Sequence, residues 1–282
     1  METIKDPSIM QAMVDKIRPA KKIGFVPTMG ALHKGHISLI ESAKKETGFV
    51  VVSIFVNPLQ FGPTEDYNAY PRPYDEDRKI LEGLAVDALF SPYVTDLYPN
   101  PQTTFINIPK LEGLLCGKTR NGQHFKGVLT IVAKLFNIIK PHIAYFGQKD
   151  YQQALMIRRM TEELIFDVKI RVLETIRGND GLAISSRNLY LSDDERKRAT
   201  VLYLSLKEAE ALLRKGENPF DIIVKAKIMI EKEGFVLDYF EIADPETLKP
   251  LEKVGDRALI SVAAKIGKTR LIDNLIYEVI PK

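Results

Sequence analysis

Two of the four histidines of the chain, His33 and His36, lie three residues apart in the run VPTMGALHKGH, which begins at Val26. A strand-like segment precedes this run and a helical segment follows it, which places both rings near the first turn of a helix. Gly30 and Gly35 have no Cβ atom, so a ligand can approach the backbone closely there. A helix that begins after a parallel strand offers unpaired N–H groups and a partial positive charge. The run therefore predicts a phosphate site to which both imidazoles donate hydrogen bonds.

Two other interpretations of this histidine pair stay open at the level of sequence. The rings can cap the helix, or they can belong to a metal site. Zinc is disfavoured because no further His or Cys lies at the usual ligand spacing.

A second polar group follows another strand-like run and has the sequence FGQKDYQQ, from Phe146 to Gln153. It is expected at the carboxyl edge of the sheet, where open α/β sheets bind ligands. Lys149 is suited to a phosphate, whereas Asp150 either meets the ligand or caps the helix that follows.

Two further loops carry polar side chains of the same kind. Residues 181–188, GLAISSRN, place two hydroxyls and an arginine where phosphate oxygens could bind, although an ordinary turn before the next helix explains them too. Residues 56–62, VNPLQFG, end a strand with Asn57 and Gln60. A neutral glutamine can orient a substrate carboxylate without blunting its nucleophilicity as a paired lysine would. The alternative for Gln60 is a turn amide bonded to backbone.

The elements that must position these groups follow from the apolar pattern. Short β-rich runs predict buried parallel strands at 23–26, 50–56, 88–90, 143–146 and 168–173, with a weaker pattern at 104–108. Helical periodicity lies between them at 36–45, 75–83, 126–140 and 151–164. This alternation predicts an α/β fold: a Rossmann-like doubly wound parallel sheet with right-handed crossovers.

The pattern changes after about residue 175. A capping box, Ser192 to Glu195, predicts one long helix that ends near Gly216, and Asn218-Pro219 begins another that ends near Gly234. Strand-like segments at 235–242, 258–264 and 270–276 follow. We therefore predict residues 1–175 as the Rossmann-like domain and 176–282 as a smaller α+β domain that acts as a lid over the ligand bound to the first.

Length and composition agree with a two-domain globular protein. The chain has 282 residues, 45% of them apolar, and a net charge of only +3, which gives no reason to expect nucleic acid or anionic membrane as a partner. Its one cysteine, Cys116, cannot form an intrachain disulfide and is expected to be a small buried residue rather than a catalytic thiol. No signal peptide or membrane span is recognisable, and a cytoplasmic protein is predicted.

The run from Pro27 to His36 resembles the HIGH-type signature of the nucleotidyltransferase superfamily. Its exact residues resemble the corresponding motif of the pantothenate synthetase (pantoate–β-alanine ligase) family. The four segments match that family in order and spacing over residues 23–191, as do Tyr70-Pro71-Arg72 and the run HFKGV at 124–128. The last hundred residues match only in length and general character.

This resemblance implies an enzyme that joins pantoate to β-alanine through a pantoyl adenylate, using ATP and Mg²⁺ and releasing AMP and pyrophosphate. It also implies a homodimer. The implied catalytic residues are His33, His36 and Lys149, with His36 as proton donor. The implied pantoate- and β-alanine-binding residues are Gln60, Gln153 and Asn57. The ATP-binding set is Met29, Gly30, Ala31, Leu32, His33, Lys34, Gly35, His36, Gly147, Gln148, Lys149, Asp150, Ile176, Ile184, Ser185, Ser186 and Arg187. The Mg²⁺ ligands stay open.

Three alternatives compete with this function. One is another adenylyltransferase of the same superfamily, and another is a nucleotide-sensing module without catalysis. The third is a metal hydrolase built on His33, His36 and Asp150.

Overall fold

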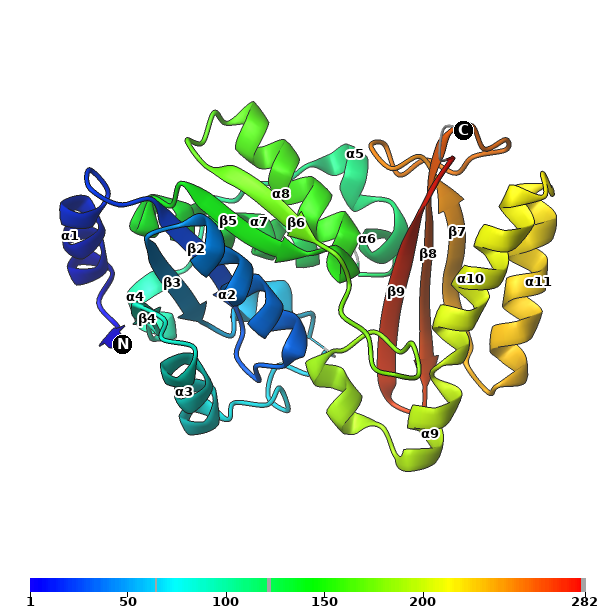
Figure 1. Cartoon of the computed structure of the whole chain (residues 1–282), viewed down its shortest axis with the longest axis horizontal. Helices are drawn as coiled ribbons and strands as arrows, with labels where there is room; N and C mark the ends of the chain where they lie inside the picture. Colours follow the sequence, from blue (N-terminus) through cyan, green and yellow to red (C-terminus); the bar gives the residue numbers. More distant parts are fainter. Residues whose placement is uncertain (64, 121–122, 280–282) are drawn as a thin grey trace.

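The computed structural model of the chain describes residues 1–63, 65–120 and 123–279, which form two parts around separate sheets (Figure 1). A six-stranded parallel sheet has the order β1-β4-β3-β2-β5-β6, and a three-stranded antiparallel sheet has the order β7-β8-β9. The prediction of an α/β fold with a second, smaller α+β domain is therefore confirmed.

The strands of the parallel sheet are β1 (Glu2–Ile4), β2 (Ile23–Thr28), β3 (Phe49–Ile54), β4 (Ala88–Phe90), β5 (Ile143–Gly147) and β6 (Lys169–Leu173). The prediction of a strand at 104–108 is wrong, because this segment runs over the surface of the long helix α7 (Gln123–Ile139), where the Ile106 N–H donates to Thr130 Oγ1 at 3.1 Å. The edge position belongs instead to β1, which pairs with β4 over three residues. A strand of three residues is too short for a pattern of apolar and polar residues to be recognised in the sequence.

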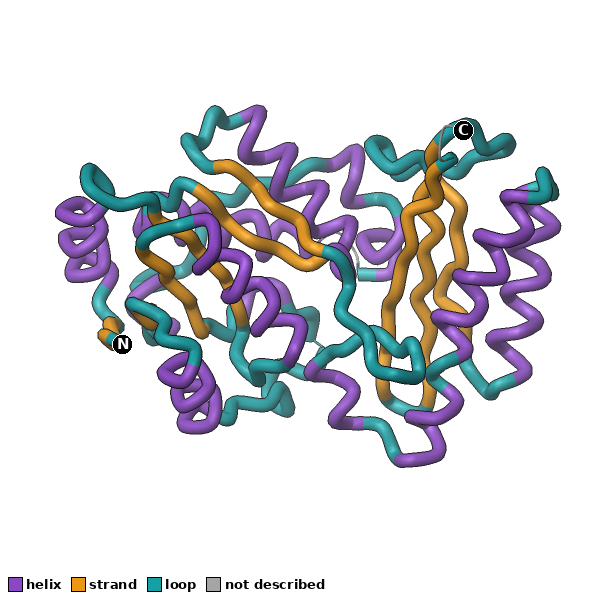
Figure 2. The backbone as a smooth tube through the Cα atoms, in the orientation of Figure 1, coloured by secondary structure: helices purple, strands orange, loops and turns teal. Residues whose placement is uncertain are grey.

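Helices cover both faces of the parallel sheet (Figure 2). On one face, Phe25 and Val51 share a core with α1 (Pro7–Ile17), α7 and α8 (Tyr151–Glu163). On the other face, their neighbours Val26 and Val52 pack against α2 (Lys34–Glu46) and α3 (Tyr74–Gly83). Successive strand residues thus point to opposite, equally buried faces, which explains why the strands read as continuous apolar runs. Shorter helical segments are α4 (Val94–Leu97), α5 (Pro109–Glu112), α6 (Leu115–Thr119), η1 (Pro58–Gln60), η2 (Gln148–Asp150) and η3 (Ser186–Tyr190).

The order of the strands creates a switch point between β2 and β5. From β2 the chain proceeds to β3 and β4 on one side, whereas β5 and β6 lie on the other. Crossovers on either side of such a point diverge, and the crevice left at the carboxyl ends of the two strands is where open α/β sheets bind ligands. The run with both histidines follows β2, and Lys149 follows β5.

The second part contains α9 (Asp193–Arg198), α10 (Val201–Arg214), α11 (Pro219–Lys232), β7 (Val236–Ala243), β8 (Arg257–Ile266) and β9 (Thr269–Glu278). Ser192 and Glu195 form the predicted capping box. The prediction of a single helix from there to Gly216 is wrong, because α9 ends at Arg198. Thr200 Oγ1 donates to the Lys197 carbonyl at 2.8 Å, and such a bond competes with the helical pattern. Gly216 and Gly234, with φ of +80° and +79°, end the next two helices as predicted.

The antiparallel sheet connects the two parts. One of its faces carries α10 and α11, and the other contributes Leu259, Ile272 and Ile276 to the core beneath the parallel sheet. Asn274 Nδ2 on β9 donates to the carbonyls of Gln148 and Lys149, at 2.9 and 2.8 Å. The smaller part therefore holds the segment that follows β5. The domain boundary between residues 175 and 176 stays a prediction. Among the described residues, no helix has the length and apolar character needed to cross a membrane.

Candidate functional site

A cavity of about 220 Å³, which we call the histidine chamber, opens at the carboxyl ends of β2 and β5. Most of the site residues predicted from sequence line it: Met29, His33, Gly35, His36, Asn57, Gln60, Gly147, Lys149, Asp150, Gln153, Ile176, Ile184, Ser185, Ser186 and Arg187. Four segments that are far apart in the sequence therefore meet around one space. Among the described residues, the predicted ATP-binding residues that do not line it are Gly30, Ala31, Leu32, Lys34 and Gln148.

The two imidazoles are held by the backbone at the start of α2. His33 is the N-cap, and its Nδ1 accepts from the Gly35 N–H at 3.1 Å. His36 Nδ1 accepts from the His33 N–H at 3.3 Å, and the rings stack with centroids 4.0 Å apart. A neutral imidazole whose Nδ1 accepts carries its proton on Nε2. The capping interpretation and the phosphate interpretation are thus compatible, because capping uses Nδ1 and leaves Nε2–H as a donor.

Burial keeps both rings neutral. Desolvation, with a smaller effect of Lys149, lowers the pKa of His33 to about 4. Desolvation, followed by the neighbouring His33, lowers the pKa of His36 to about 3. At neutral pH each ring therefore offers a hydrogen bond from an uncharged N–H rather than a mobile proton from an imidazolium.

Lys149 and Asp150 project from the segment after β5. Lys149 Nζ lies 3.7 Å from Asp150 Oδ1, and its side chain is mostly buried. Asp150 is the N-cap residue of α8, but its side chain makes no capping hydrogen bond, so the capping interpretation of this carboxyl is wrong. Within residues 1–63, 65–120 and 123–279, no three His, Cys, Asp or Glu side chains gather as they would around a metal ion. The alternative of a metal centre on His33, His36 and Asp150 gains no support.

The neutral amides form a connected group. Asn57 Nδ2 donates to Gln60 Oε1 at 3.2 Å and to the Gly127 carbonyl at 3.1 Å, while Asn57 Oδ1 accepts from the Tyr98 hydroxyl at 2.9 Å. Gln60 Nε2 lies 3.1 Å from Met29 Sδ. A Cβ atom on Gly127 would stand 2.3 Å from the Leu59 carbonyl oxygen, so only glycine lets α7 approach η1 this closely. Among the described residues, the side-chain amide of Gln60 makes its hydrogen bonds with the side chains of Asn57 and Met29. This argues against the alternative that the amide only bonds the backbone of its own turn.

The loop at 184–187 reaches the chamber from the second part. Ser185 Oγ accepts from the Arg187 N–H and caps η3, which agrees with the turn interpretation, and a hydroxyl that accepts in this way can still donate to a phosphate oxygen. Ser186 Oγ donates to the Ala31 carbonyl at 3.2 Å. Arg187 makes a two-pronged ion pair with Asp66, through Nε at 3.2 Å and Nη2 at 3.0 Å. The loop is therefore docked against the first part by side chains.

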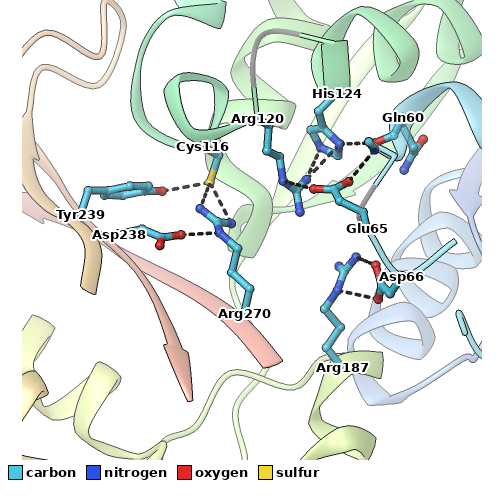
Figure 3. Close-up of polar contacts among 11 residues, drawn as sticks. Gln60, Glu65, Asp66, Cys116, Arg120, His124, Arg187, Asp238, Tyr239 and Arg270 are labelled. Carbon is cyan, nitrogen blue, oxygen red and sulfur yellow. Dashed lines mark hydrogen bonds and ion pairs between the residues drawn. The ribbon is translucent and has the colours of Figure 1, made fainter. Parts of the chain in front are cut away.

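A second cavity of about 110 Å³, the arginine chamber, adjoins the first. Both are lined by Met29, Gln60, Lys149, Asp150, Gln153, Ser185 and Arg187. The wall of the arginine chamber also includes Arg120, His124, Arg270, Cys116 and Tyr239 (Figure 3).

Charged and polar groups of this wall are held in pairs. Arg120 Nε lies 3.0 Å from Glu65 Oε1, and Arg270 Nε donates to Asp238 Oδ2 at 2.6 Å. Cys116 is buried, as predicted, and its Sγ lies 3.0 Å from the Tyr239 hydroxyl.

His124 is a polar link that connects this wall to the amide group. Its Nδ1 lies 2.8 Å from the Gln60 carbonyl, and Arg120 Nη1 lies 2.9 Å from the ring nitrogens. Because a carbonyl only accepts, the contact with Gln60 favours a neutral ring with its proton on Nδ1, which leaves Nε2 to accept from Arg120. Burial, and next the charge of Arg120, lower its pKa to about 3, which agrees with that assignment.

Several residues that shape the site were not predicted from sequence. Asp66, Asp77, Arg120 and Arg270 act through partners that only the fold brings near. For Asp77, the three successive acids at 75–77 signal nothing beyond a favourable helix start. His124 had a signal, the family-like run HFKGV, but no role followed from it.

Comparisons with known proteins extend the resemblance to the whole chain. The family model described as pantoate–β-alanine ligase matches residues 2–276. A pantothenate synthetase of Thermodesulfovibrio yellowstonii is 53% identical over 281 residues, covering 99% of this chain and 100% of that protein. One from Thermotoga neapolitana is 51% identical, covering 98% of each chain. The last hundred residues, whose motifs were indistinct, are thus covered too.

Solved structures agree with these sequence matches. The crystal structure of a pantothenate synthetase from Thermus thermophilus superposes with a TM-score of 0.92 at 44% identity, covering 98% of this chain and 99% of that chain. A pantoate–β-alanine ligase from Francisella tularensis, complexed with β-γ ATP and β-alanine, gives a TM-score of 0.84 at 38% identity and covers 100% of both chains.

Proposed function

The chain belongs to the pantoate–β-alanine ligase family, and from that premise we propose that it condenses pantoate with β-alanine, driven by ATP cleavage, through a pantoyl adenylate. One observation carries the proposal: groups suited to phosphate and groups suited to a carboxylate, from four separate segments, line one chamber at the switch point of the sheet.

The proposed reaction has two steps. A carboxylate oxygen of pantoate attacks the α-phosphorus of ATP, the bond from that phosphorus to the bridging oxygen breaks, and pyrophosphate leaves. The amine of β-alanine then attacks the carbonyl carbon of the adenylate, AMP leaves with the former carboxylate oxygen, and the amine loses a proton. Both steps depend chiefly on positioning and on stabilising charge at phosphate oxygens.

We assign the residues of the histidine chamber accordingly. Neutral Nε2–H groups of His33 and His36 donate to phosphate oxygens as negative charge builds up on the leaving pyrophosphate. A pKa of about 3 disfavours the proton-donor role predicted for His36, so we propose a hydrogen-bond donor in its place. Gln60 and Gln153 hold pantoate, with Asn57 fixing Gln60. The triphosphate is held by Lys149, Ser185, Ser186 and Arg187, and the nucleotide lies along Gly147, Ile176 and Ile184.

Mg²⁺ fits the chamber as a partner of ATP. This ion is usually bound through one or two carboxylates together with substrate phosphates and water. The chamber wall includes the carboxylates of Asp150 and Glu174, which suit that role. When bound, the ion would neutralise charge on the phosphate oxygens.

Three further features belong to the proposal. Residues 176–282 act as a lid that shields the adenylate from water. The enzyme is a homodimer, which light scattering on the purified chain would test. It works in the cytoplasm on small molecules, without nucleic acid or membrane.

The experiment that tests the function is pyrophosphate release from ATP with a panel of acids, followed by AMP release with a panel of amines. We expect release to depend on pantoate and amide formation to depend on β-alanine. Pantoate with isotopically labelled carboxylate oxygen should transfer one labelled oxygen to AMP. Unlabelled AMP would rule out the adenylate, and pyrophosphate release without pantoate would rule out the proposed substrate.

A further inference from the structure

The turn that carries the histidines has an unusual backbone. Gly30 and Ala31 both have positive φ, +81° and +51°. Glycine adopts such angles freely, but alanine does so only at a cost in free energy. Strain of this kind persists where the surroundings over-determine the conformation, and it gathers at functional sites.

One side chain from another element holds the turn in this conformation. Asp77, in the first turn of α3, is 2% exposed. Its Oδ2 accepts from the Ala31 N–H at 2.8 Å, and its Oδ1 accepts from the Leu32 N–H at 2.7 Å. A Cβ atom on Gly30 would stand 2.9 Å from Oδ2, so the carboxylate also requires glycine there.

The backbone that Asp77 holds is linked to two sides of the histidine chamber, the turn after β2 and the loop at 184–187. Leu32 directly precedes His33, whose backbone N–H fixes the ring of His36. The carbonyl of Ala31 accepts from Ser186 Oγ, in the loop from the second part. A shift of the backbone between Gly30 and Leu32 would therefore move the two imidazoles together with the Ala31 carbonyl to which Ser186 donates.

We propose that Asp77 is a positioning residue for the nucleotide, which sets the direction of the two imidazoles and the docking point of the 184–187 loop. Among the described residues it lines neither chamber, so it acts through the turn and not on a substrate. The inference rests on the proposed function only in taking the bound nucleotide to be ATP.

The chemistry of a carboxylate explains why aspartate is needed. Two N–H groups point at its two oxygens, and each requires an acceptor because the site is buried. Asparagine has nearly the same shape but offers one acceptor and one NH₂ donor. In Asp77→Asn one backbone N–H must face another donor, so the turn is expected to relax.

The test compares Asp77→Asn with Glu76→Gln, an exposed neighbour in the same helical turn. Glu76→Gln removes the same charge near the same helix terminus without touching the turn. Calorimetry would give the affinity for ATP, and kinetics would give kcat with KM for ATP and for β-alanine. For Asp77→Asn we expect ATP affinity and kcat to fall about tenfold or more, because small misplacements at a reacting centre have effects of that size. KM for β-alanine should stay within about twofold, and Glu76→Gln should match the unaltered chain.

Two outcomes would overturn the proposal: ATP affinity and kcat within about twofold of the unaltered chain, or equal changes in both variants. If Asp77→Asn does not fold, Ser186→Ala removes the bond to the Ala31 carbonyl as well as a proposed phosphate donor, and unchanged ATP affinity in that variant would also count against the proposal. The calorimetric readout needs no turnover. An enzyme that binds ATP but does not use pantoate would therefore refute the proposed function and leave the role of Asp77 standing.

Discussion

The two walls of the histidine chamber are built in different ways. The turn after β2 is fixed by buried bonds: Thr28 Oγ1 donates to the Ser53 carbonyl and accepts from the Gly30 N–H, and Asp77 holds the next two N–H groups. The loop at 184–187 comes from the other part of the molecule and is docked by the Arg187–Asp66 ion pair and by hydrogen bonds of Ser186 with the Ala31 carbonyl and Tyr70.

This difference separates what is preorganised from what can move. Groups fixed before substrate arrives need no reorganisation at the moment of reaction, so they contribute most to the chemical step. A segment held to the rest of the molecule by a few side-chain contacts opens at a lower free-energy cost and is suited to admitting a nucleotide. We therefore expect the loss of a donor from the turn to act mainly on kcat and changes around the loop to act mainly on KM for ATP, whereas Asp77, which supports both, should affect both quantities.

The largest effect should follow the removal of a donor from the fixed wall. His36→Ala should lower kcat about 10²- to 10³-fold, the usual loss for one well-aimed donor at a developing charge. Pyrophosphate release at saturating ATP and pantoate measures it. His142→Gln is the matched control, because that histidine lies before β5, at the opposite end of the sheet, where it accepts from the Ile23 N–H. Near-normal turnover of His36→Ala would remove the ring from the mechanism.

The second effect concerns pH, since three buried histidines are neutral in the folded chain. The pKa of His33 is lowered to about 4 and those of His36 and His124 to about 3, whereas an unfolded imidazole titrates near 6.5. The unfolded chain therefore takes up protons first, so stability is complete above about pH 6.5 and declines as pH falls towards 4. From pH 7 to 5.5 we expect a loss of about 1 kcal/mol for each of these histidines.

Denaturant unfolding across this pH range would measure the decline. His36→Gln should make the slope shallower by about a quarter to a third, because one of the four histidines whose pKa is lowered is gone. The loop at 184–187 contains only hydroxyls, an arginine and apolar side chains, and contributes no group that titrates there. A slope unchanged by His36→Gln would mean that other groups dominate the acid response.

The third effect tests the docked wall. Asp66→Asn removes the charge that holds Arg187, and we expect KM for ATP to rise about five- to tenfold with kcat within about threefold, as befits a partly buried ion pair. Asp75→Asn, an exposed carboxyl in α3, is the control. A lower KM for ATP would show that Asp66 competes with phosphate for Arg187, and the loop would then not depend on this clamp.

The same contrast explains what the sequence could predict. The histidine run, the segment with Lys149 and the Ser-Ser-Arg loop each hold their polar groups in contiguous residues, and parallel strands bring the first two of these segments to one edge of the sheet. The strand rule alone accounts for those lining residues that follow β2, β3 and β5, whereas the rest of the fifteen predicted residues around the chamber were placed there by the family resemblance. Helix ends at Gly216 and Gly234 were likewise local signals.

What the sequence could not predict depends on contacts between distant residues. Asp77 meets the turn 46 positions away, and Asp66 meets Arg187 at a separation of 121. An acid in a first helical turn looks the same whether it faces solvent or a buried N–H. The break at Ala199 and the three-residue strand β1 are local, but each is too small to change a periodicity.

The smallest effect should come from the rim between the two parts. Arg158 Nη2 lies 2.6 Å from Glu246 Oε2, and both side chains are exposed by more than a third. Exposed pairs contribute little, so Glu246→Gln should lower the free energy of unfolding by no more than about 0.5–1 kcal/mol and leave KM for ATP unchanged. Thermal unfolding and the KM assay measure the two quantities. If KM for ATP rose as much as in Asp66→Asn, the position of the loop would be set at this rim. The loop would then be positioned by a hinge between the two parts of the molecule and not by its own contacts with the first part.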